Sequence, residues 1–431
     1  MNLSSSYKRF LSLLILLSSG AAAVAGPVDA AVLGAKEPLR GRYIVQLKPT
    51  TTTSKATTFP AVDGITDRWS ATRGFAGNFS SATVQRLLSS PDVAFVEQDG
   101  IVHIPEFTSG HSRRAPAAEH WPDSRDAAQA GAPPTAQVVL TQTDAPWGLA
   151  RLSQDPKLTP PAVPGQYTYL YGAQAGAGVD VYVLDTGIFV SHTDFAGRAV
   201  WGATFGGWPN ADGHGHGTHL AYASLTSPTG VGLYWVLIPP LFEGLRLPGL
   251  AMAWRSISGI NWVVQAAQAS GRPSVILLAI AGSASAALDN AVTSASLAGV
   301  HIVVAATDPN TSPARAQGAI IKVGATSIAD AAVSGGSFGA GLTLFAPGAN
   351  TVSAGIASAI ATNTFSGASP AVAHVAGLSA YFLSVLGPLT TGGLGQVLVT
   401  TSVQGALTGV GATTPNRLAS NNLARLGIVV L

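Results

Sequence analysis

Apolar and polar positions along the chain follow two periods, one typical of strands and one typical of helices. Short, continuously apolar runs include "VDVYVLD", "SVILLAIAG" and "VHIVVAAT". Residues 256–271 and 287–299 lie between such runs, repeat apolar residues at the helical period, and each end at a glycine. Apolar strands that alternate with helices are typical of a parallel sheet with helices on both faces. The pattern therefore predicts an α/β fold from about residue 143 onward.

The residues before this region predict a separate small domain and a linker. Residues 40–104 contain an alternating strand pattern, "GRYIVQL", then an amphipathic helix, a Pro91-Asp92 turn and a second strand. Residues 105–142 are polar and rich in alanine and proline, a composition that buries too little apolar surface to fold alone. We interpret the first segment as a small α+β domain and the second as a flexible, cleavable linker.

The first 25 residues have the pattern of a secretory signal peptide. Lys8 and Arg9 precede the apolar run "FLSLLILLSS", and Ala23-Val24-Ala25 gives small residues at the cleavage positions. The apolar run is shorter than the about 20 residues that a membrane-spanning helix needs. We therefore expect a secreted, extracellular protein without a membrane anchor, with the signal peptide removed near Ala25.

Composition narrows the chemistry further. Hydrophobic residues make up 47% of the 431 residues and charged residues 10%, which favours a large buried core. The net charge of +2, without a cluster of Lys or Arg, argues against a nucleic-acid partner. The chain has no cysteine, which excludes disulfides, thiolate metal sites and a cysteine nucleophile.

Three polar residues stand where predicted strands and helices meet. Asp185 ends the strand "VYVLD", His216 lies in "DGHGHGTHLA", and Ser369 precedes a long apolar helix. Hydrolysis by a serine needs this set, because an imidazole must take the hydroxyl proton and a carboxylate must orient the imidazole. Each residue alone is more typical of a turn, a loop or a helix cap. Their order along the chain, Asp, His and Ser, is the subtilisin order.

The motifs around these residues resemble those of subtilisin-like serine proteases (subtilases, peptidase family S8) of the secreted fungal proteinase K type. They are "WGLARLS", "VYVLDTGI", "GHGTHLA", "SGASPAVAHVAGLSAY" and "TTPNRLASN". The resemblance implies a three-layer α/β/α fold with a mostly parallel sheet in a peptidase domain at 143–431. It implies an Asp185, His216 and Ser369 triad, with His216 rather than His214 or His219 opening the H-G-T-H motif.

The small domain resembles the inhibitor I9-like propeptide of the same family. The resemblance rests on the strand "YIVQLK" and on "PDVAFVEQD". It implies that the hydrolase is made as an autoinhibited zymogen, in which the propeptide at 40–104 is an intramolecular inhibitor. Its other partners would be protein or peptide substrates, and we expect a monomer.

The sequence departs from the family at the oxyanion site. The resembled proteases place an Asn side chain in an A-A-G-N segment, and this chain has Asp308 there, in "AATD". An ionised Asp308 donates no hydrogen bond and repels the negative charge that develops on the substrate oxygen. Asn310 could stand in for the missing Asn only if the loop were rebuilt by a shift in register.

The substrate-binding edges also differ from the family pattern. The S-L-G-G strand that pairs with the substrate backbone reads Ala279-Ile280-Ala281-Gly282. Backbone pairing tolerates such changes because it uses only main-chain groups. The opposite edge is replaced by "YWVLIPPLFEGLRLPGLAMAW", whose position in the cleft the sequence leaves open.

The sequence contains two candidate glycosylation sites and no clear metal site. Asn78 and Asn310 are N-x-S/T acceptors, so either residue is a candidate glycosylation site in a secreted protein. Calcium sites are common in the resembled family, but we find no carboxylate cluster that predicts one. We therefore expect no cofactor and no metal.

Three functions fit these features. The first is an active serine endopeptidase, favoured by the complete catalytic set and the propeptide. The second is a degenerate subtilase with weak or no proteolysis that acts as a binding or decoy protein, suggested by Asp308 and the altered cleft edge. The third is an esterase that uses the same three residues, because ester hydrolysis tolerates a damaged oxyanion site better.

Replacing Asp308 with Asn should raise turnover by about 10²-fold, the scale expected for one restored oxyanion donor. The rate of acylation by an active ester, measured from pH 5 to pH 9 in the wild type and in Asp308→Asn, checks this. Equal rates across that range would mean that residue 308 lies outside the oxyanion site.

Overall fold

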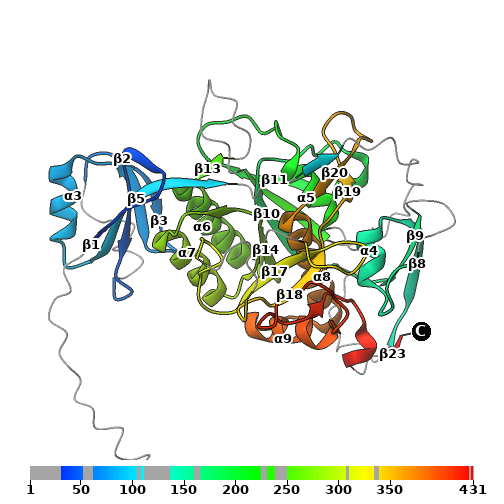
Figure 1. The fold of residues 1–431 in the computed structure, drawn as a ribbon. Helices are drawn as coiled ribbons and strands as arrows, with labels where there is room; N and C mark the ends of the chain where they lie inside the picture. Colours follow the sequence, from blue (N-terminus) through cyan, green and yellow to red (C-terminus); the bar gives the residue numbers. More distant parts are fainter. Residues whose placement is uncertain are drawn as a thin grey trace, which may run out of the picture.

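The computed structural model gives the protein a small N-terminal domain next to a larger α/β domain (Figure 1). The structure describes residues 31–51, 62–103, 108–110, 136–159, 166–224, 231–237, 250–306, 310–333, 339–426 and 429–430. The predicted signal peptide and Asp308 lie outside these residues.

In its described residues, the small domain is a sheet with helix α3 packed against it. The strands, in the spatial order β1-β5-β2-β4-β3, are β1 (Ala31–Leu33), β5 (Val93–His103), β2 (Pro38–Leu47), β4 (Gly74–Asn78) and β3 (Ile65–Trp69). Helix α3 (Ser81–Leu88) starts after Ser80, whose side chain accepts a hydrogen bond from the Thr83 N–H. Val84 and Leu87 on this helix pack against Phe75 and Val96 of the sheet. The prediction of a small α+β domain is confirmed.

The larger domain is built around a nine-stranded sheet. Its strands, in spatial order, are β11 (Ala199–Thr204), β12 (Val231–Leu237), β10 (Val179–Asp185), β14 (Ser274–Leu278), β16 (His301–Ala305), β17 (Ile320–Thr326), β18 (Leu344–Pro347), β22 (Arg417–Leu418) and β21 (Val403–Gln404). The pairings are parallel from β11 to β22, and only β21 joins antiparallel. The predicted, mostly parallel sheet is confirmed.

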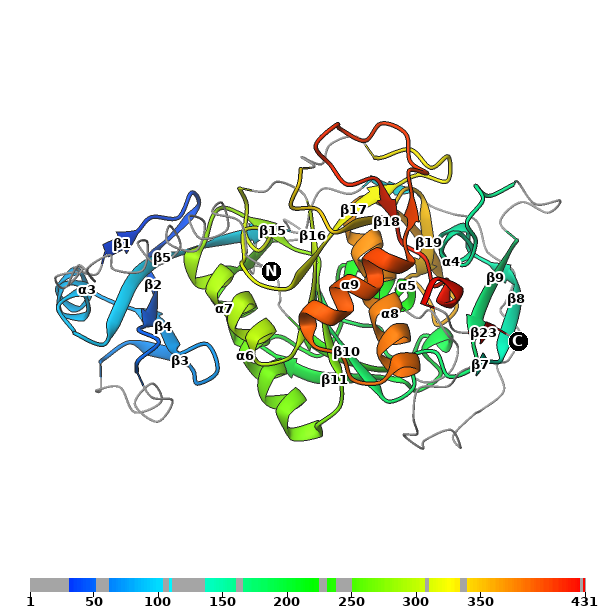
Figure 2. The same ribbon diagram turned by 90° about the horizontal axis from the view of Figure 1, so that it is seen from below.

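Helices cover both faces of this sheet, as the continuously apolar strands predict. Helices α6 (Ala253–Ser270) and α7 (Ala286–Leu297) lie on the face that the small domain approaches (Figure 2). Helices α5 (His216–Ala223) and α8 (Ala368–Leu386) pack on the other face, where α9 (Thr391–Thr401) follows α8. Along β10, Val181 and Val183 face the α5–α8 layer, and Tyr182 and Leu184 face the α6–α7 layer.

Helix ends follow local sequence signals. Helix α6 ends before Gly271, which has φ of 65°, a left-handed conformation that glycine adopts without strain. Helix α8 is long and apolar enough to cross a membrane by length and composition, but 89% of its most apolar window is buried inside the protein. Among the described residues it is the one helix that meets those criteria, and it acts as a core helix here.

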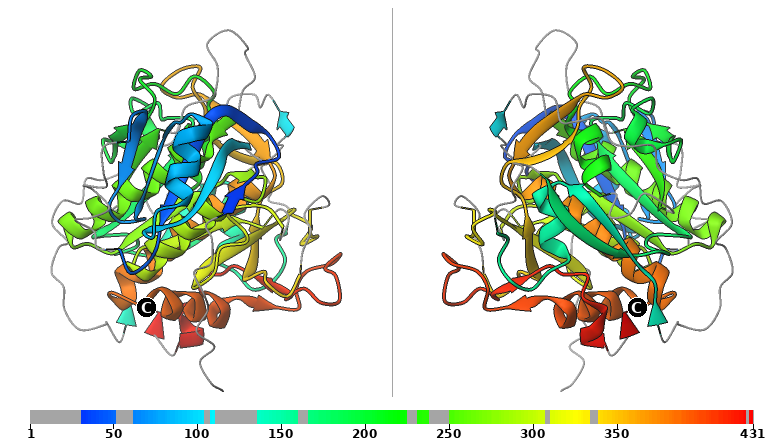
Figure 3. Two further views of the ribbon diagram at one scale, coloured as in Figure 1. Left: turned by 90° about the vertical axis from the view of Figure 1, so that its left-hand side faces the viewer. Right: turned by 90° about the vertical axis from the view of Figure 1, so that its right-hand side faces the viewer.

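The remaining elements lie around the two main layers. They are β6 (Thr108–Gly110), β7 (Ala136–Gln137), β8 (Val139–Ala145), α4 (Trp147–Leu152), β9 (Tyr167–Gly172), η1 (Thr193–Phe195), β13 (Leu250–Met252), β15 (Ala281–Gly282), β19 (Thr351–Ala354), β20 (Thr362–Ser366), η2 (Leu423–Leu426) and β23 (Val429–Val430). The antiparallel pair β8–β9 and the small domain lie at opposite ends of the molecule (Figures 1 and 3). Strand β8 begins at Val139, inside the segment that the sequence predicts to be linker.

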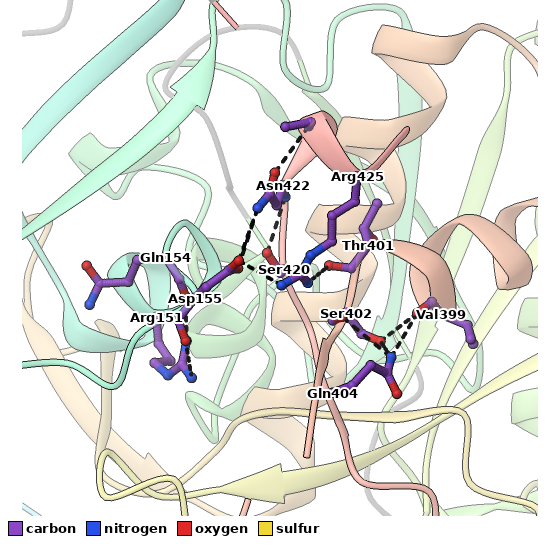
Figure 4. Close-up of polar contacts among 11 residues, drawn as sticks. Arg151, Gln154, Asp155, Val399, Thr401, Ser402, Gln404, Ser420, Asn422 and Arg425 are labelled. Carbon is purple, nitrogen blue, oxygen red and sulfur yellow. Dashed lines mark hydrogen bonds and ion pairs between the residues drawn. The ribbon is translucent and has the colours of Figure 1, made fainter. Parts of the chain in front are cut away.

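The segment after α4 is joined to the last described helical turn. Asp155 pairs with Arg425 at 2.7 Å, and Arg425 also donates to the Thr401 carbonyl at the end of α9 (Figure 4). Nearby, the fully buried Arg151 makes two hydrogen bonds to Asp330, at 2.8 and 3.0 Å. The Asp155–Arg425 pair and the parallel pairing of β7 with β23 tie the start of the α/β domain to its last described residues.

Candidate active site

Asp185 and His216 meet where the central strand β10 ends and helix α5 begins. The His216 Nδ1 atom lies 2.8 Å from Asp185 Oδ1, and neither side chain is exposed to solvent. The same carboxylate oxygen accepts the Thr186 N–H at 2.7 Å. A carboxylate held in this way fixes which ring nitrogen carries the proton and leaves Nε2 to accept another.

Ser369 is the second residue of helix α8, the core helix that packs against α5. Its side chain is buried, and its Oγ makes no hydrogen bond to the rest of the described chain. The Phe365 ring, four residues earlier, stacks on His216 with ring centroids 5.9 Å apart and on His219 at 4.4 Å. The segment that leads to Ser369 therefore lies directly against the helix that carries His216.

The other histidines near His216 are buried or half-buried, and two of them hydrogen-bond to backbone carbonyls. His219 Nε2 lies 2.9 Å from the Thr351 carbonyl, and complete burial lowers its pKa to about 3. His374 Nδ1 donates to the carbonyls of Pro347 and Pro370, and burial lowers its pKa to about 4. Burial also lowers the pKa of His214. Both His219 and His374 are therefore neutral over the ordinary pH range.

Strand β5 of the small domain extends beyond its own sheet and lies between two strands of the larger domain. On one side His103 and Val102 pair antiparallel with Ala281 and Gly282 of β15. On the other side the same residues, with Ile101, pair antiparallel with β13. Strand β13 is thus the second edge of the cleft, which the sequence left unplaced.

Only part of the predicted substrate-binding segment reaches this cleft. Ala281 and Gly282 form β15, whereas Ala279 and Ile280 follow β14 and are buried in the core. A Cβ atom at Gly282 would lie 2.6 Å from Val102 Cγ1, so glycine permits the close approach of β5. Beside β15 lies a cavity of about 730 Å³ whose lining includes His103, Ser283 and Asn310.

A second segment of the same chain lies along the strand that leads to Ser369. Thr108–Gly110 (β6) pairs antiparallel with β20, with Thr108 opposite Ser366 and Ser109 opposite Phe365. The chain therefore runs along β13 and β15 before residue 104 and along β20 after residue 107.

Two buried carboxylates of β5 lie at the N-termini of the helices beneath it. Asp99 Oδ1 accepts the Trp254 N–H in the first turn of α6, and Glu97 Oε2 accepts the Ala287 N–H in the first turn of α7. Helix α6 has no side-chain cap of its own, and Arg42 donates to the other Asp99 oxygen at 3.2 Å. Carboxylates at these positions are favoured by the helix dipole.

Asp212, which the sequence analysis did not single out, lies beside the Asp185–His216 pair. Its carboxylate accepts five hydrogen bonds, from the Thr186 hydroxyl, the N–H groups of His214 and Gly215, and the N–H and hydroxyl of Thr218. The sequence signal that could have found Asp212 is its position before the glycine-rich start of a helix, where Asp is favoured as an acceptor.

The two predicted glycosylation sites are exposed in the structure. Asn78 is exposed at the end of β4, and Asn310 is exposed beside the cleft cavity. Residue 308 lies in a stretch that the structure leaves undescribed, so its predicted role in the oxyanion site stays a prediction. Within the described residues no group of three or more His, Cys, Asp or Glu side chains is arranged to hold a metal ion.

The fold, the buried Asp–His pair at the end of a parallel strand and the strand-filled cleft define a protein of the subtilisin class. The family described as the subtilase family matches residues 176–425, and the peptidase inhibitor I9 family matches residues 63–105. The chain therefore belongs to the subtilase family and is a serine-type endopeptidase with an I9 propeptide.

Individual relatives agree with this assignment. A subtilisin-like serine protease of Sarocladium strictum, AsES, is 34% identical over 357 residues, which are 81% of this chain and 81% of that protein. A cuticle-degrading serine protease of Arthrobotrys oligospora is 34% identical over 83% of this chain and 80% of its own length. Nothing in these relatives favours the degenerate, non-proteolytic alternative.

Solved structures show the same fold. A cold adapted subtilisin-like serine proteinase matches with a TM-score of 0.55 and 32% identity, over 65% of this chain and 99% of its own. Fervidolysin from Fervidobacterium pennivorans matches with a TM-score of 0.64 over 92% of this chain and 63% of its own. At 17% identity, fervidolysin supports the fold alone.

The buried carboxylates of β5 should make propeptide release depend on pH. Burial raises the pKa of Asp99 to about 7 and raises that of Glu97. A carboxyl group that is easier to protonate in the complex than in the free propeptide strengthens the complex at acid pH, and that strengthening is lost as pH rises through about 7. As pH rises from about 4 to about 7, the titration of Asp99 alone should weaken the binding of the propeptide by up to about tenfold per pH unit.

The measurement is the rate at which the cleaved propeptide leaves the enzyme, followed by gel filtration and by the lag in peptide hydrolysis at pH 5, 6, 7 and 8. Asp99→Asn keeps an acceptor for the Trp254 N–H and removes the titrating group, so its release should vary less with pH. Release from the wild type that is equally fast at pH 5 and pH 8 would contradict the prediction.

Proposed function

We propose that the protein is a secreted serine endopeptidase in which Asp185, His216 and Ser369 form the catalytic triad. The observation that carries the proposal is the 2.8 Å contact between the buried side chains of Asp185 and His216. His216 lies on helix α5, and Phe365, in the segment that leads to Ser369, stacks on the His216 ring. In this mechanism the Ser369 hydroxyl attacks the peptide carbonyl while His216 Nε2 takes its proton. Asp185 holds the imidazole tautomer and stabilises the imidazolium that forms.

The oxyanion would be stabilised mainly from the start of helix α8. The Ser369 N–H lies in the first turn of this helix, where backbone N–H groups have no intrahelical acceptor and the dipole favours negative charge. The second donor of the family is an Asn side chain, and Asp308 replaces it here. We therefore expect slower acylation than an Asn at this position would give.

Substrates would bind as extended strands. The propeptide strand β5 serves as an example, because its residues 101–103 pair antiparallel with β13 and β15 through main-chain groups. Strand β20 would hold the part of the substrate beyond the cleaved bond, where the chain's own β6 lies in the precursor. The precursor is thus inhibited by its own chain on both sides of Ser369.

A covalent probe tests the triad. A fluorophosphonate should label the wild type and should label neither Ser369→Ala nor His216→Ala, because the attack needs both groups. Ser379→Ala is the matched control: Ser379 is buried on the same helix and donates to the Val375 carbonyl, so its loss should leave labelling intact. Labelling of Ser369→Ala would place the nucleophile elsewhere, and an unlabelled wild type would favour the degenerate alternative.

Secretion is the second part of the proposal. The signal-peptide pattern of residues 1–25 supports export, and the exposed Asn78 and Asn310 would then be open to glycosylation. N-terminal sequencing of the precursor and mature forms in the culture medium should give a start near residue 26 for the first and a start in the 105–142 segment for the second. A single species starting near residue 26 would contradict the propeptide cleavage.

A further inference from the structure

We propose that Asp212 is a positioning residue that holds His216 in its productive orientation toward Asp185. The inference rests on the proposed triad and adds a residue to it. One carboxylate accepts hydrogen bonds from both segments that carry the Asp185–His216 pair. Asp212 Oδ1 accepts from the Thr186 hydroxyl at 3.0 Å and from the N–H groups of His214 and Gly215 at 3.0 and 2.8 Å. Its Oδ2 accepts from the N–H and hydroxyl of Thr218 at 2.9 and 2.6 Å.

These partners are the neighbours of the catalytic pair in sequence. Thr186 follows Asp185 at the end of β10, and its hydroxyl oxygen also accepts the Gly217 N–H at 3.1 Å. Thr218 lies two residues after His216, and its hydroxyl oxygen also accepts the Phe189 N–H at 2.9 Å. The network therefore connects the loop after β10 to the first turn of α5 through hydroxyls that both donate and accept.

The start of α5 depends on Asp212 because the helix has no cap of its own. Its N-cap residue is Gly215, with φ of 88° and no side chain to accept a hydrogen bond. Asp212 lies three residues earlier and accepts N–H groups that would otherwise lack an acceptor at the helix start. The first residue of the helix so capped is His216, so the position of its ring depends on this cap.

The two loops also touch closely, which leaves little room for adjustment. A Cβ atom at Gly187 would lie 2.7 Å from the Ala211 carbonyl oxygen and 2.8 Å from the Asp212 Cα. If the Asp212 carboxylate is lost, the loop after β10 and the start of α5 can shift relative to each other. A displacement of about 1 Å at a catalytic group can reduce the rate about 10²-fold.

Asp212→Asn is the sharpest variant. The amide keeps one acceptor oxygen and presents an NH₂ group, a donor, to backbone N–H groups that need an acceptor. We expect kcat on a peptide substrate to fall by about 10²-fold with KM within about twofold, because substrate binding uses β13, β15 and β20 and not this network. The low-field proton resonance of the His216 Nδ1–H should also move or broaden.

Asp180→Asn is the matched control. Asp180 lies near the opposite end of the same strand β10, its side chain is fully buried, and it pairs with Arg272 at 2.7 Å. This variant makes the same Asp-to-Asn change on strand β10 and should leave kcat and the low-field resonance unchanged. A purely structural role for Asp212 predicts that the two variants behave alike.

A third variant decides the question if Asp212→Asn does not fold. Thr218→Val removes one hydroxyl that donates to Asp212 and keeps the side-chain shape, and kcat should fall by about three- to tenfold. Unchanged kcat in a folded Thr218→Val, or a loss in Asp212→Asn no larger than in Asp180→Asn, would overturn the proposal. Failure of the triad itself appears separately, as a wild type that a fluorophosphonate does not label.

Discussion

The buried hydrogen bond between Asp185 and His216 requires that a strand end and a helix begin at one fixed point. A carboxylate without solvent is costly unless donors compensate it, and here Thr186 and His216 both donate to Asp185 Oδ1. Strand β10 can hold its last residue in place because apolar side chains pack on both of its faces. The packing of the core therefore fixes the position of Asp185, and a change in the core side chains along β10 would shift this catalytic carboxylate.

Elements with a clear period were predictable from the sequence, and contacts made at long range were not. Helix α6 and its end at Gly271 follow from local signals, and so does the strand that ends at Asp185. Strand β13 was missed because it comes after a proline-rich apolar segment and becomes a strand only by pairing with β5, about 150 residues away. The first four residues of strand β8 were assigned to the linker, because the strand's polar side chains give no clear strand pattern and its pairing depends on β9.

In the active site too, residues in local motifs were predictable and contacts between distant segments were not. Asp185 and His216 were recognisable because each lies in a short motif at an element boundary, and the structure brings them together. The contact between Asp212 and Thr186 was hidden, because it joins two loops whose relative position no local pattern gives, whereas the other donors to Asp212 follow it closely in sequence. The departure at Asp308 was visible from the motif alone, since it is a change of residue type.

The β5 strand pairs with main-chain groups of the cleft that would otherwise be exposed. Without β5, the segments that form β13 and β15 would present unpaired main-chain donors and acceptors to other extended chains. In the precursor β5 satisfies these groups and at the same time belongs to the sheet of its own domain. The small domain and the cleft therefore share one strand, so inhibition does not require a separate binding element.

The junction of β7 with β23, reinforced by the pairing of Asp155 and Arg425, has a consequence for the lifetime of the enzyme. A peptidase is surrounded by copies of itself, and the segments of a folded protein that are cut first are those that fray into extended, accessible chain. The first and last described segments of the α/β domain are paired with each other. Neither segment is therefore a free extended strand that the cleft of another copy could bind. We therefore expect the resistance of the enzyme to self-digestion to depend on this junction.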